Sequence, residues 1–230
     1  MARLLRRYGG LLLLLQLAAC KEAPPPVEPR GNSVEAPAAP QAEAEHLVLA
    51  FGDSLYAGYG LGPGESFPAV LDRQLEASGL AVNIVNAGVS GDTTAAGLAR
   101  LDFTLEGLKR RPDLAIVGLG GNDVLRGIDP VETQANLEAI VRELDRRGIP
   151  VVLTGMLAPR NLGQDYVERF DRIYPDLAKR YGAALDPFFL EGVIGKPELM
   201  QGDGIHPNAK GVQVMARRLA PIVAKELQPA

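Results

Sequence analysis

From residue 46 onward, short runs of apolar residues alternate with longer amphipathic stretches. The short runs are typical of buried β-strands, and the amphipathic stretches are typical of helices that cover a sheet. The pattern predicts strands at 47–51, 81–85, 113–119 and 150–154, with a weaker fifth at 183–185. It predicts helices at 66–77, 93–106, 131–146, 166–181 and 208–226. This alternation indicates an α/β domain with a mostly parallel sheet.

Local signals mark the boundaries of the helix predicted at 131–146. Asp129 can cap its first turn, Pro130 suits the first helical position, and Gly148 follows its end. In an open parallel sheet, ligands bind beyond the carboxyl ends of the strands. Candidate chemistry is therefore sought in the residues directly after each strand.

The chain before residue 46 has a different character. Its first 19 residues combine three arginines with an apolar run, which predicts a secretory signal peptide. The apolar run is shorter than the roughly 20 residues that a membrane-spanning helix needs. Residues 17–20, Leu-Ala-Ala-Cys, resemble a bacterial lipobox, which implies that Cys20 becomes the lipidated first residue of the mature chain. The alternative is a chance cysteine beside an ordinary cleavage site.

Residues 20–45 are rich in Pro, Ala and Glu, which predicts a lipidated cysteine followed by a disordered tether. By the lipobox rule, Lys21 after the cysteine favours sorting to the outer membrane. We therefore expect a periplasmic protein with membrane contact through a lipid anchor, with secretion as the alternative. Residues 46–230 form the predicted catalytic domain.

Composition narrows the possible functions. The 230 residues, 47% of them hydrophobic, suit one domain with a single core. Removal of residues 1–19 takes the formal net charge from −4 to −7, which argues against nucleic acid as a partner. One cysteine excludes a disulfide framework, and two histidines, His46 and His206, exclude a histidine-rich metal site. We expect no metal and no cofactor.

Two strand ends carry a candidate nucleophile and a candidate oxyanion donor. The first strand runs into Gly-Asp-Ser-Leu at 52–55, which places Ser54 at a strand-to-helix turn as a candidate nucleophile. The plainer interpretation is a serine that caps a helix. After the second strand, Gly91 can expose a backbone N–H to an oxyanion, while Asp92 or Thr93 caps the next helix.

The third strand ends in Gly-Gly-Asn-Asp at 120–123. The carboxamide of Asn122 can donate to an oxyanion, and the glycines allow a close approach of the chain. The segment also looks like half of a dinucleotide fingerprint. We reject that interpretation, because Asp123 stands where a small residue is needed and would repel phosphate.

Asp-Gly-Ile-His-Pro at 203–207 supplies a candidate base. A nucleophilic serine needs a base, and the base needs a carboxylate on its other ring nitrogen. Asp203 and His206 can meet within one turn, and His46 lies at the tether boundary, so His206 is the candidate imidazole base. A histidine that caps the helix after Pro207 is the alternative.

Taken in order, these four segments resemble the four blocks of the GDSL, or SGNH, hydrolase family, and the likeness is closest to the bacterial branch of periplasmic thioesterases, arylesterases and lysophospholipases. Supporting segments lie at 57–60, 97–101, 173–175 and 187–189, so the resemblance covers roughly residues 47–226. It implies a three-layer α/β/α sandwich with a five-stranded parallel sheet, of flavodoxin-like type. That strand count matches the five strands predicted above.

The resemblance also implies roles for the candidate residues. Ser54 is the expected nucleophile, Asp203 and His206 complete the triad, and Ser54, Gly91 and Asn122 supply the oxyanion hole. Two positions depart from the family pattern: Tyr56 replaces a small hydroxyl residue that is frequent there, and Leu162 replaces a tyrosine that is common in this branch. Either difference can change the shape of the acyl pocket without changing the catalytic residues.

The sequence therefore predicts a serine esterase of carboxylic esters or thioesters, acting as a monomer on a small-molecule ester or lipid. Apolar residues after the fourth strand predict a substrate-binding segment, which is either a flap over the acyl chain or packed on the domain: Met156, Leu157, Ala158 and Leu162. Two alternatives remain. One is an acyl-transferase or carbohydrate deacetylase with the same triad, and the other is a lipoprotein binding module without enzymatic activity.

Overall fold

The structure is a computed structural model that describes residues 46–228. Five parallel strands form one sheet in the order β2-β1-β3-β4-β5. Their bounds are β1 His46–Gly52, β2 Val82–Gly88, β3 Leu114–Gly118, β4 Val151–Thr154 and β5 Ala184–Asp186. All five predicted strands are present, and the expected parallel sheet is confirmed.

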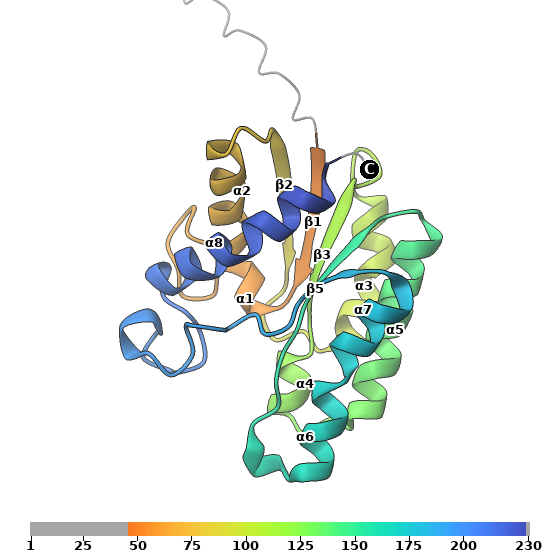
Figure 1. Ribbon diagram of the computed structural model, residues 1–230, viewed down its shortest axis with the longest axis vertical. Helices are drawn as coiled ribbons and strands as arrows, with labels where there is room; N and C mark the ends of the chain where they lie inside the picture. Colours follow the sequence, from red (N-terminus) through yellow and green to blue (C-terminus); the bar gives the residue numbers. More distant parts are fainter. Residues whose placement is uncertain (1–45, 229–230) are drawn as a thin grey trace, which may run out of the picture. The chain divides into compact units, whose positions relative to one another are not determined.

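Within residues 46–228, six longer helices and four short ones accompany the strands. The longer ones are α2 Phe67–Ala77, α3 Thr94–Glu106, α5 Pro130–Arg146, α6 Gln164–Asp171, α7 Ile173–Tyr181 and α8 Ala209–Glu226. The short ones are α1 Ser54–Ala57, α4 Gly121–Leu125, and the 3₁₀ turns η1 Arg160–Leu162 and η2 Pro197–Leu199. The predicted three-layer α/β/α architecture is confirmed, with α2 and α8 on one face of the sheet and α3, α5 and α7 on the other (Figure 1).

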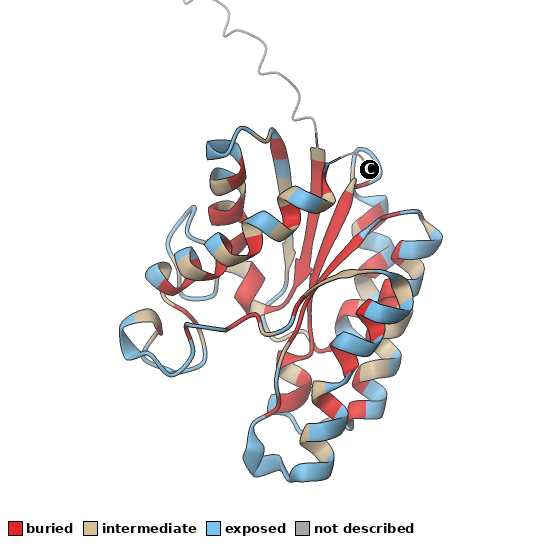
Figure 2. Ribbon diagram, viewed as in Figure 1, coloured by how far each residue is buried: buried red, intermediate tan, exposed pale blue. Residues whose placement is uncertain are grey.

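Each strand sends alternate side chains into two separate cores. Val48 and Ala50 of β1 pack under α2 and α8, whereas Leu49 and Phe51 pack under α3 and α5. This alternation follows from the two-residue period of a strand. Both faces of the central strands are consequently buried, as Figure 2 shows. Such strands read as continuous apolar runs in the sequence, as parallel strands generally do.

Helix α5 begins where its local signals predicted. The Asp129 side chain accepts a hydrogen bond from the Val131 N–H at 2.9 Å, and Pro130 is the first helical residue. Four apolar side chains at helical spacing face the core: Leu137, Ile140, Val141 and Leu144. Capping and amphipathic spacing therefore act together to place this helix.

The single helix predicted at 166–181 is wrong, because the structure has two helices that meet at Arg172. Pro175 explains the break. Its nitrogen carries no hydrogen for the carbonyl of residue 171, and its ring disfavours a continuous helix through that point. Helix α7 starts anew, and the Asp176 N–H donates to the Arg172 carbonyl at 3.0 Å.

Strand β5 is fastened to α8 by an ion pair whose carboxylate is buried. The Arg218 guanidinium binds the carboxylate of Asp186, which is 1% exposed, and also donates to the Phe189 carbonyl at 2.7 Å. Burial raises the pKa of Asp186. This contact fixes the segment after β5, which forms part of the cavity described below.

The strand order places a topological switch point between β1 and β3. The chain leaves β1 towards β2 on one side and leaves β3 towards β4 on the other. In such sheets the carboxyl ends of these two strands flank a crevice. The short helices α1 and α4 begin at those ends and carry Ser54 and Asn122. None of the helices within residues 46–228 combines the length and apolar character needed to cross a membrane.

Candidate active site

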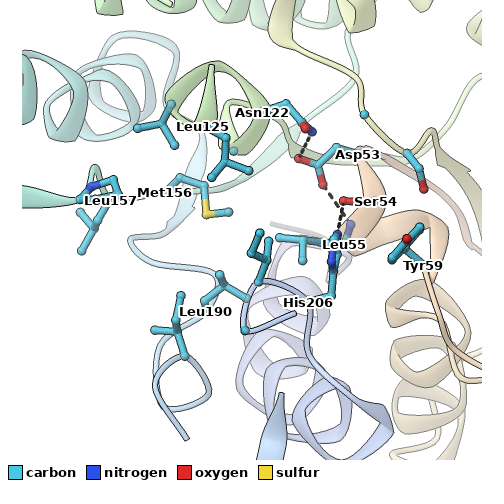
Figure 3. A pocket seen from close by; sticks show the side chains of 18 of the residues that line it. Asp53, Ser54, Leu55, Tyr59, Asn122, Leu125, Met156, Leu157, Leu190 and His206 are labelled. Atoms are coloured by element: carbon cyan, nitrogen blue, oxygen red, sulfur yellow. Dashed lines mark hydrogen bonds between the residues drawn. The ribbon is translucent and has the colours of Figure 1, made fainter. Parts of the chain in front are cut away.

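Ser54 is the first residue of α1, directly after β1. The Asp53 carboxylate caps this helix, because its Oδ1 accepts the Leu55 N–H at 3.0 Å. The Ser54 hydroxyl faces a cavity that opens beyond the sheet (Figure 3). The capping role that a serine can take at such a turn is thus filled by its neighbour, and the Ser54 hydroxyl is left available.

The structure brings the three predicted triad residues together. His206 Nε2 lies 2.9 Å from Ser54 Oγ, and His206 Nδ1 lies 2.6 Å from Asp203 Oδ2. Serine, imidazole and carboxylate therefore form one hydrogen-bonded chain, across 152 residues of sequence in the case of Ser54 and His206. This geometry allows the imidazole to take a proton from the serine hydroxyl.

The turn that carries this pair is built around Asp203. Its Oδ1 accepts the backbone N–H groups of Ile205 at 2.9 Å and of His206 at 3.0 Å. The His206 N–H, the His206 ring and the Ile205 N–H lower the pKa of Asp203 to about 2. The carboxylate is consequently ionised at neutral pH and can hold the proton of the imidazole on Nδ1.

Gly91 lies on the cavity wall in the loop after β2. Its φ is +86°, a left-handed conformation that favours glycine. Among the described residues, none accepts a hydrogen bond from the backbone N–H of Gly91 or of Ser54. Ser54 and Gly91, which both line the cavity, therefore each carry a backbone N–H without an acceptor within residues 46–228.

Of the two candidate caps of α3, Asp92 is not the cap. Thr93 is the cap, since its hydroxyl accepts the Ala96 N–H at 3.3 Å. Asp92 instead pairs with Arg100 at 2.6 Å, and Arg100 also donates to the Gly52 carbonyl at 3.0 Å. The guanidinium thus ties the loop of Gly91 to the end of β1.

The Asn122 side chain projects from α4 towards Asp53 and Asp92. Its Nδ2 donates to the Asp92 carbonyl at 3.0 Å and makes a longer contact of 3.4 Å with Asp53 Oδ2. Both contacts orient the N–H₂ group, and not the carbonyl oxygen, towards Asp53 and the serine turn. The longer contact is the weaker one, and its hydrogen is the one that a stronger acceptor in the cavity can take.

Asp53 is a site residue that the sequence analysis did not single out. It is 3% exposed, lines the cavity, and contacts both α1 and Asn122. Burial raises its pKa to about 6, although the Leu55 N–H and the nearby His206 act in the opposite direction. The sequence does contain a signal for this residue, which is an acidic side chain between a buried strand and the candidate nucleophile.

A cavity of about 340 Å³ adjoins the serine, and most of its wall is apolar. Figure 3 shows the polar residues Asp53, Ser54, Asn122 and His206 on one side of it and Leu125, Met156, Leu157 and Leu190 on the other. Several apolar side chains at its mouth remain exposed: Tyr59, Leu125, Leu157, Ile194 and Ile205. The shape and lining suit an apolar group attached to a carbonyl.

Of the four apolar residues predicted to form the substrate-binding segment, Met156 and Leu157 line this cavity, whereas Ala158 and Leu162 do not. Leu162 lies off the cavity because it ends the 3₁₀ turn η1, beyond Pro159, with its side chain exposed. Ala158 is buried, and its N–H donates to Asp171 at 2.8 Å. Part of the segment therefore packs on the domain, and part of it faces the cavity.

Tyr56 does not line the cavity either. Its side chain is fully buried, packs against Phe67 and Phe189 with ring centroids 5.1 and 5.3 Å away, and bonds Thr154 Oγ1 at 2.8 Å. Burial raises the pKa of this phenol. Tyr56 therefore points into the core, although it belongs to the same short helix as Ser54.

No group of three or more His, Cys, Asp or Glu side chains within residues 46–228 is arranged to hold a metal ion. The polar side chains that line the cavity belong to Asp53, Ser54, Tyr59, Ser90, Asn122 and His206. Asp203 lies behind the imidazole, in contact with its Nδ1. Cys20 and the predicted signal peptide and tether lie outside the described residues.

Comparison with known proteins identifies the family of the chain. The pattern of the GDSL-like Lipase/Acylhydrolase family matches residues 50–214. The chain belongs to this family. The predicted family resemblance is thereby confirmed, and with it the prediction of a serine ester hydrolase.

Similar proteins of this family carry related names. Esterase TesA of Pseudomonas aeruginosa is 42% identical over 167 residues, which cover 73% of this chain and 82% of that protein. Thioesterase 1/protease 1/lysophospholipase L1 of Escherichia coli is 40% identical over 189 residues, 82% of this chain and 86% of that protein. A solved structure of AlinE4, an SGNH-hydrolase family esterase, superimposes with a TM-score of 0.68 at 54% identity, and covers 80% of this chain and 97% of that one.

Proposed function

We propose that Ser54, His206 and Asp203 form the catalytic triad of this esterase, and that the N–H groups of Ser54, Gly91 and Asn122 form its oxyanion hole. The observation that carries the proposal is the unbroken chain of contacts from Ser54 Oγ through His206 to Asp203, at 2.9 and 2.6 Å. The two unpaired backbone N–H groups beside it support the assignment of the oxyanion hole.

The reaction follows from these positions. His206 Nε2 takes the proton of Ser54 Oγ while Oγ attacks the ester carbonyl carbon, and the carbonyl oxygen becomes an oxyanion held by the three N–H donors. His206 then gives the proton to the leaving alcohol or thiol, and an acyl-enzyme remains on Ser54. Water then attacks the acyl carbonyl and gives a proton to His206. The bond between the acyl carbon and Ser54 Oγ breaks, His206 returns the proton to Oγ, and the carboxylic acid leaves.

Asp203 has a supporting part in both half-reactions. Its ionised carboxylate accepts the Nδ1–H of His206, keeps Nε2 free to accept a proton, and stabilises the imidazolium that forms. Asn122 exchanges its 3.4 Å contact with Asp53 for a bond to the oxyanion. That interaction strengthens as charge develops, which is the requirement for accelerating the chemical step.

The apolar lining supports a substrate whose acyl or aryl group is apolar, such as an aryl ester, a lysophospholipid or an apolar thioester. The same lining disfavours a carbohydrate ester as substrate, because sugar hydroxyls would lose hydrogen bonds against Met156, Leu157 and Leu190. Hydrolysis of p-nitrophenyl esters with acyl chains of increasing length measures this preference.

Replacement of the nucleophile tests the proposal. Ser54→Ala is expected to lower the hydrolysis of p-nitrophenyl butyrate by several orders of magnitude. Circular dichroism checks that the variant folds. Wild-type-like turnover by the folded variant would rule out Ser54 as the nucleophile.

We further propose that the protein acts as a monomer in the periplasm, held by a lipid on Cys20, with the outer membrane as its destination. The basic and apolar residues before Cys20 and the Pro-rich segment after it support this proposal. Metabolic labelling with a palmitate analogue tests it. Wild-type chain is expected to be labelled and Cys20→Ala is not, and label on both would contradict the lipid anchor.

A further inference from the structure

The segment that carries Asp203 and His206 is weakly packed. Residues 202–205 are all exposed, and a side chain at Gly202 or Gly204 would meet no atom within 4 Å. The hydrogen bonds of Asp203 lie inside the turn, so they fix the shape of the turn without fixing its distance from Ser54. Something else must hold the imidazole 2.9 Å from the serine.

Gln201 makes four hydrogen bonds at this place. Its Nε2 donates to the Tyr59 carbonyl at 2.7 Å and to the Pro207 carbonyl at 3.0 Å. Its backbone N–H donates to the His206 carbonyl at 2.8 Å, and its carbonyl accepts the Gly204 N–H at 3.0 Å. One residue therefore closes the turn from 201 to 207 and joins it to the segment that follows α1.

The segment that follows α1 leaves room for the Gln201 side chain. Gly60 has a φ of +71°, and a Cβ atom there would lie 2.2 Å from Gln201 Oε1. The centroids of the Tyr59 and His206 rings lie 4.6 Å apart. Tyr59 thus contacts the imidazole with its side chain, while its carbonyl is held by Gln201.

We propose that Gln201 is a positioning residue, which holds the His206 turn against the segment after α1 and thereby sets the distance between His206 and Ser54. This proposal rests on the proposed function, because it concerns the same triad. Gln201 does not line the cavity, so it acts on the reaction through His206 and not through contact with substrate.

The expected effect follows from the geometry of proton transfer. A displacement of about 1 Å in a catalytic group can cost on the order of 100-fold in rate. Loss of the two carboxamide bonds frees the turn to move by such a distance. We expect the rate of attack by Ser54 to fall roughly 10- to 100-fold, with the KM of a short ester changed by less than about twofold.

Two substitutions in the full chain test this. Gln201→Met keeps the length of the side chain and removes both donors, and Gln201→Glu sets a carboxylate against two carbonyl oxygens. Gln164→Met is the matched control, since Gln164 is an exposed glutamine at the start of α6 whose Nε2 donates to Glu168 at 2.8 Å. The readouts are the rate of Ser54 labelling by a fluorophosphonate, and kcat and KM for p-nitrophenyl butyrate.

Slow labelling and a low kcat with an unchanged KM in both Gln201 variants, and wild-type values in Gln164→Met, support the proposal. Wild-type labelling rates in folded Gln201 variants overturn it. A change in KM without a change in kcat also overturns it, because that result places Gln201 in substrate binding.

Gly60→Ala perturbs the same contact from the other side, in case the Gln201 variants fail to fold. Its methyl group displaces the Gln201 amide and is expected to slow labelling by a similar factor. Normal labelling by folded Gly60→Ala refutes the proposal. Absence of labelling at Ser54 in wild type overturns the proposed function and this proposal with it, whereas labelling that is indifferent to Gln201 overturns only the latter.

Discussion

Substitution of the buried acid beside the nucleophile is expected to stabilise the protein while lowering its activity. Asp53 is 3% exposed, and burial raises its pKa from 3.8 to about 6. The folded chain therefore retains the Asp53 proton to a higher pH than the unfolded chain does. As pH rises from 4 to 6, this group makes the folded state progressively less stable. Asp53→Asn removes that dependence.

The size of the effect follows from the shift in pKa. At about 1.36 kcal/mol per unit, a rise from 3.8 to about 6 corresponds to about 3 kcal/mol at pH 7. Asparagine can still accept the Leu55 N–H and preserve the cap of α1. The expected gain at pH 7 is at most this value, or roughly 6 to 12 °C in Tm for a domain of this size. The gain vanishes below about pH 4.

Urea unfolding, followed by far-ultraviolet circular dichroism, measures the free energy of unfolding of wild type and variant from pH 4 to pH 7. Asp145→Asn, which replaces an exposed carboxylate on α5, is the matched control and is expected to change stability little at any pH. Activity on p-nitrophenyl butyrate is measured in parallel. It should fall, because the new N–H₂ group faces the N–H₂ group of Asn122.

The dependence of the difference on pH decides the outcome. If Asp53→Asn and wild type differ by the same free energy at pH 4 and at pH 7, the reasoning about Asp53 is wrong. A variant that is less stable than wild type at pH 7 would show that the carboxylate itself stabilises the fold, through its bonds to α1 and Asn122.

Further expectations follow from the same structure. Asn122→Ala should lower kcat by roughly 100- to 1,000-fold and still leave measurable turnover, because two backbone donors remain; wild-type kcat would remove Asn122 from the oxyanion hole. Leu190→Phe narrows the cavity and should shift the preference among p-nitrophenyl esters towards shorter acyl chains, whereas Leu162→Tyr, which lies off the cavity, should leave the chain-length profile unchanged. The opposite pattern would mean that the acyl chain follows another path. Arg218→Met leaves the carboxylate of β5 buried without its partner and should cost about 3 to 5 kcal/mol in urea unfolding; a loss below about 1 kcal/mol would show that this ion pair is dispensable.

Much of the fold could be predicted because its signals are local. Buried parallel strands appear in the sequence as apolar runs, and the start of α5 is marked by the capping residue Asp129 and by Pro130. The division of the helix at Arg172 was visible in Pro175 but was outweighed by the amphipathic pattern around it. The short helices α1 and α4 have too few residues to show a helical period.

The contacts among Ser54, His206 and Asp203 were predictable for a chemical reason, since a nucleophilic serine needs a base and His206 was the candidate base. The orientation of individual side chains was not predictable. Tyr56 is two residues from Ser54 yet points into the core, and Leu162 is five residues from Leu157 yet leaves the cavity. Asp53 and Gln201 matter through contacts with residues distant in sequence, such as Asn122 and Tyr59, which no local pattern reveals.

The central claim is that Ser54 is the activated nucleophile of this esterase. Reaction of the folded full chain with a fluorophosphonate, followed by digestion and mass spectrometry, tests it most directly. We predict a single adduct on the peptide that contains Ser54, formed far more slowly in His206→Ala. An adduct on a different residue, or continued ester hydrolysis by protein that carries the adduct on Ser54, would contradict the claim.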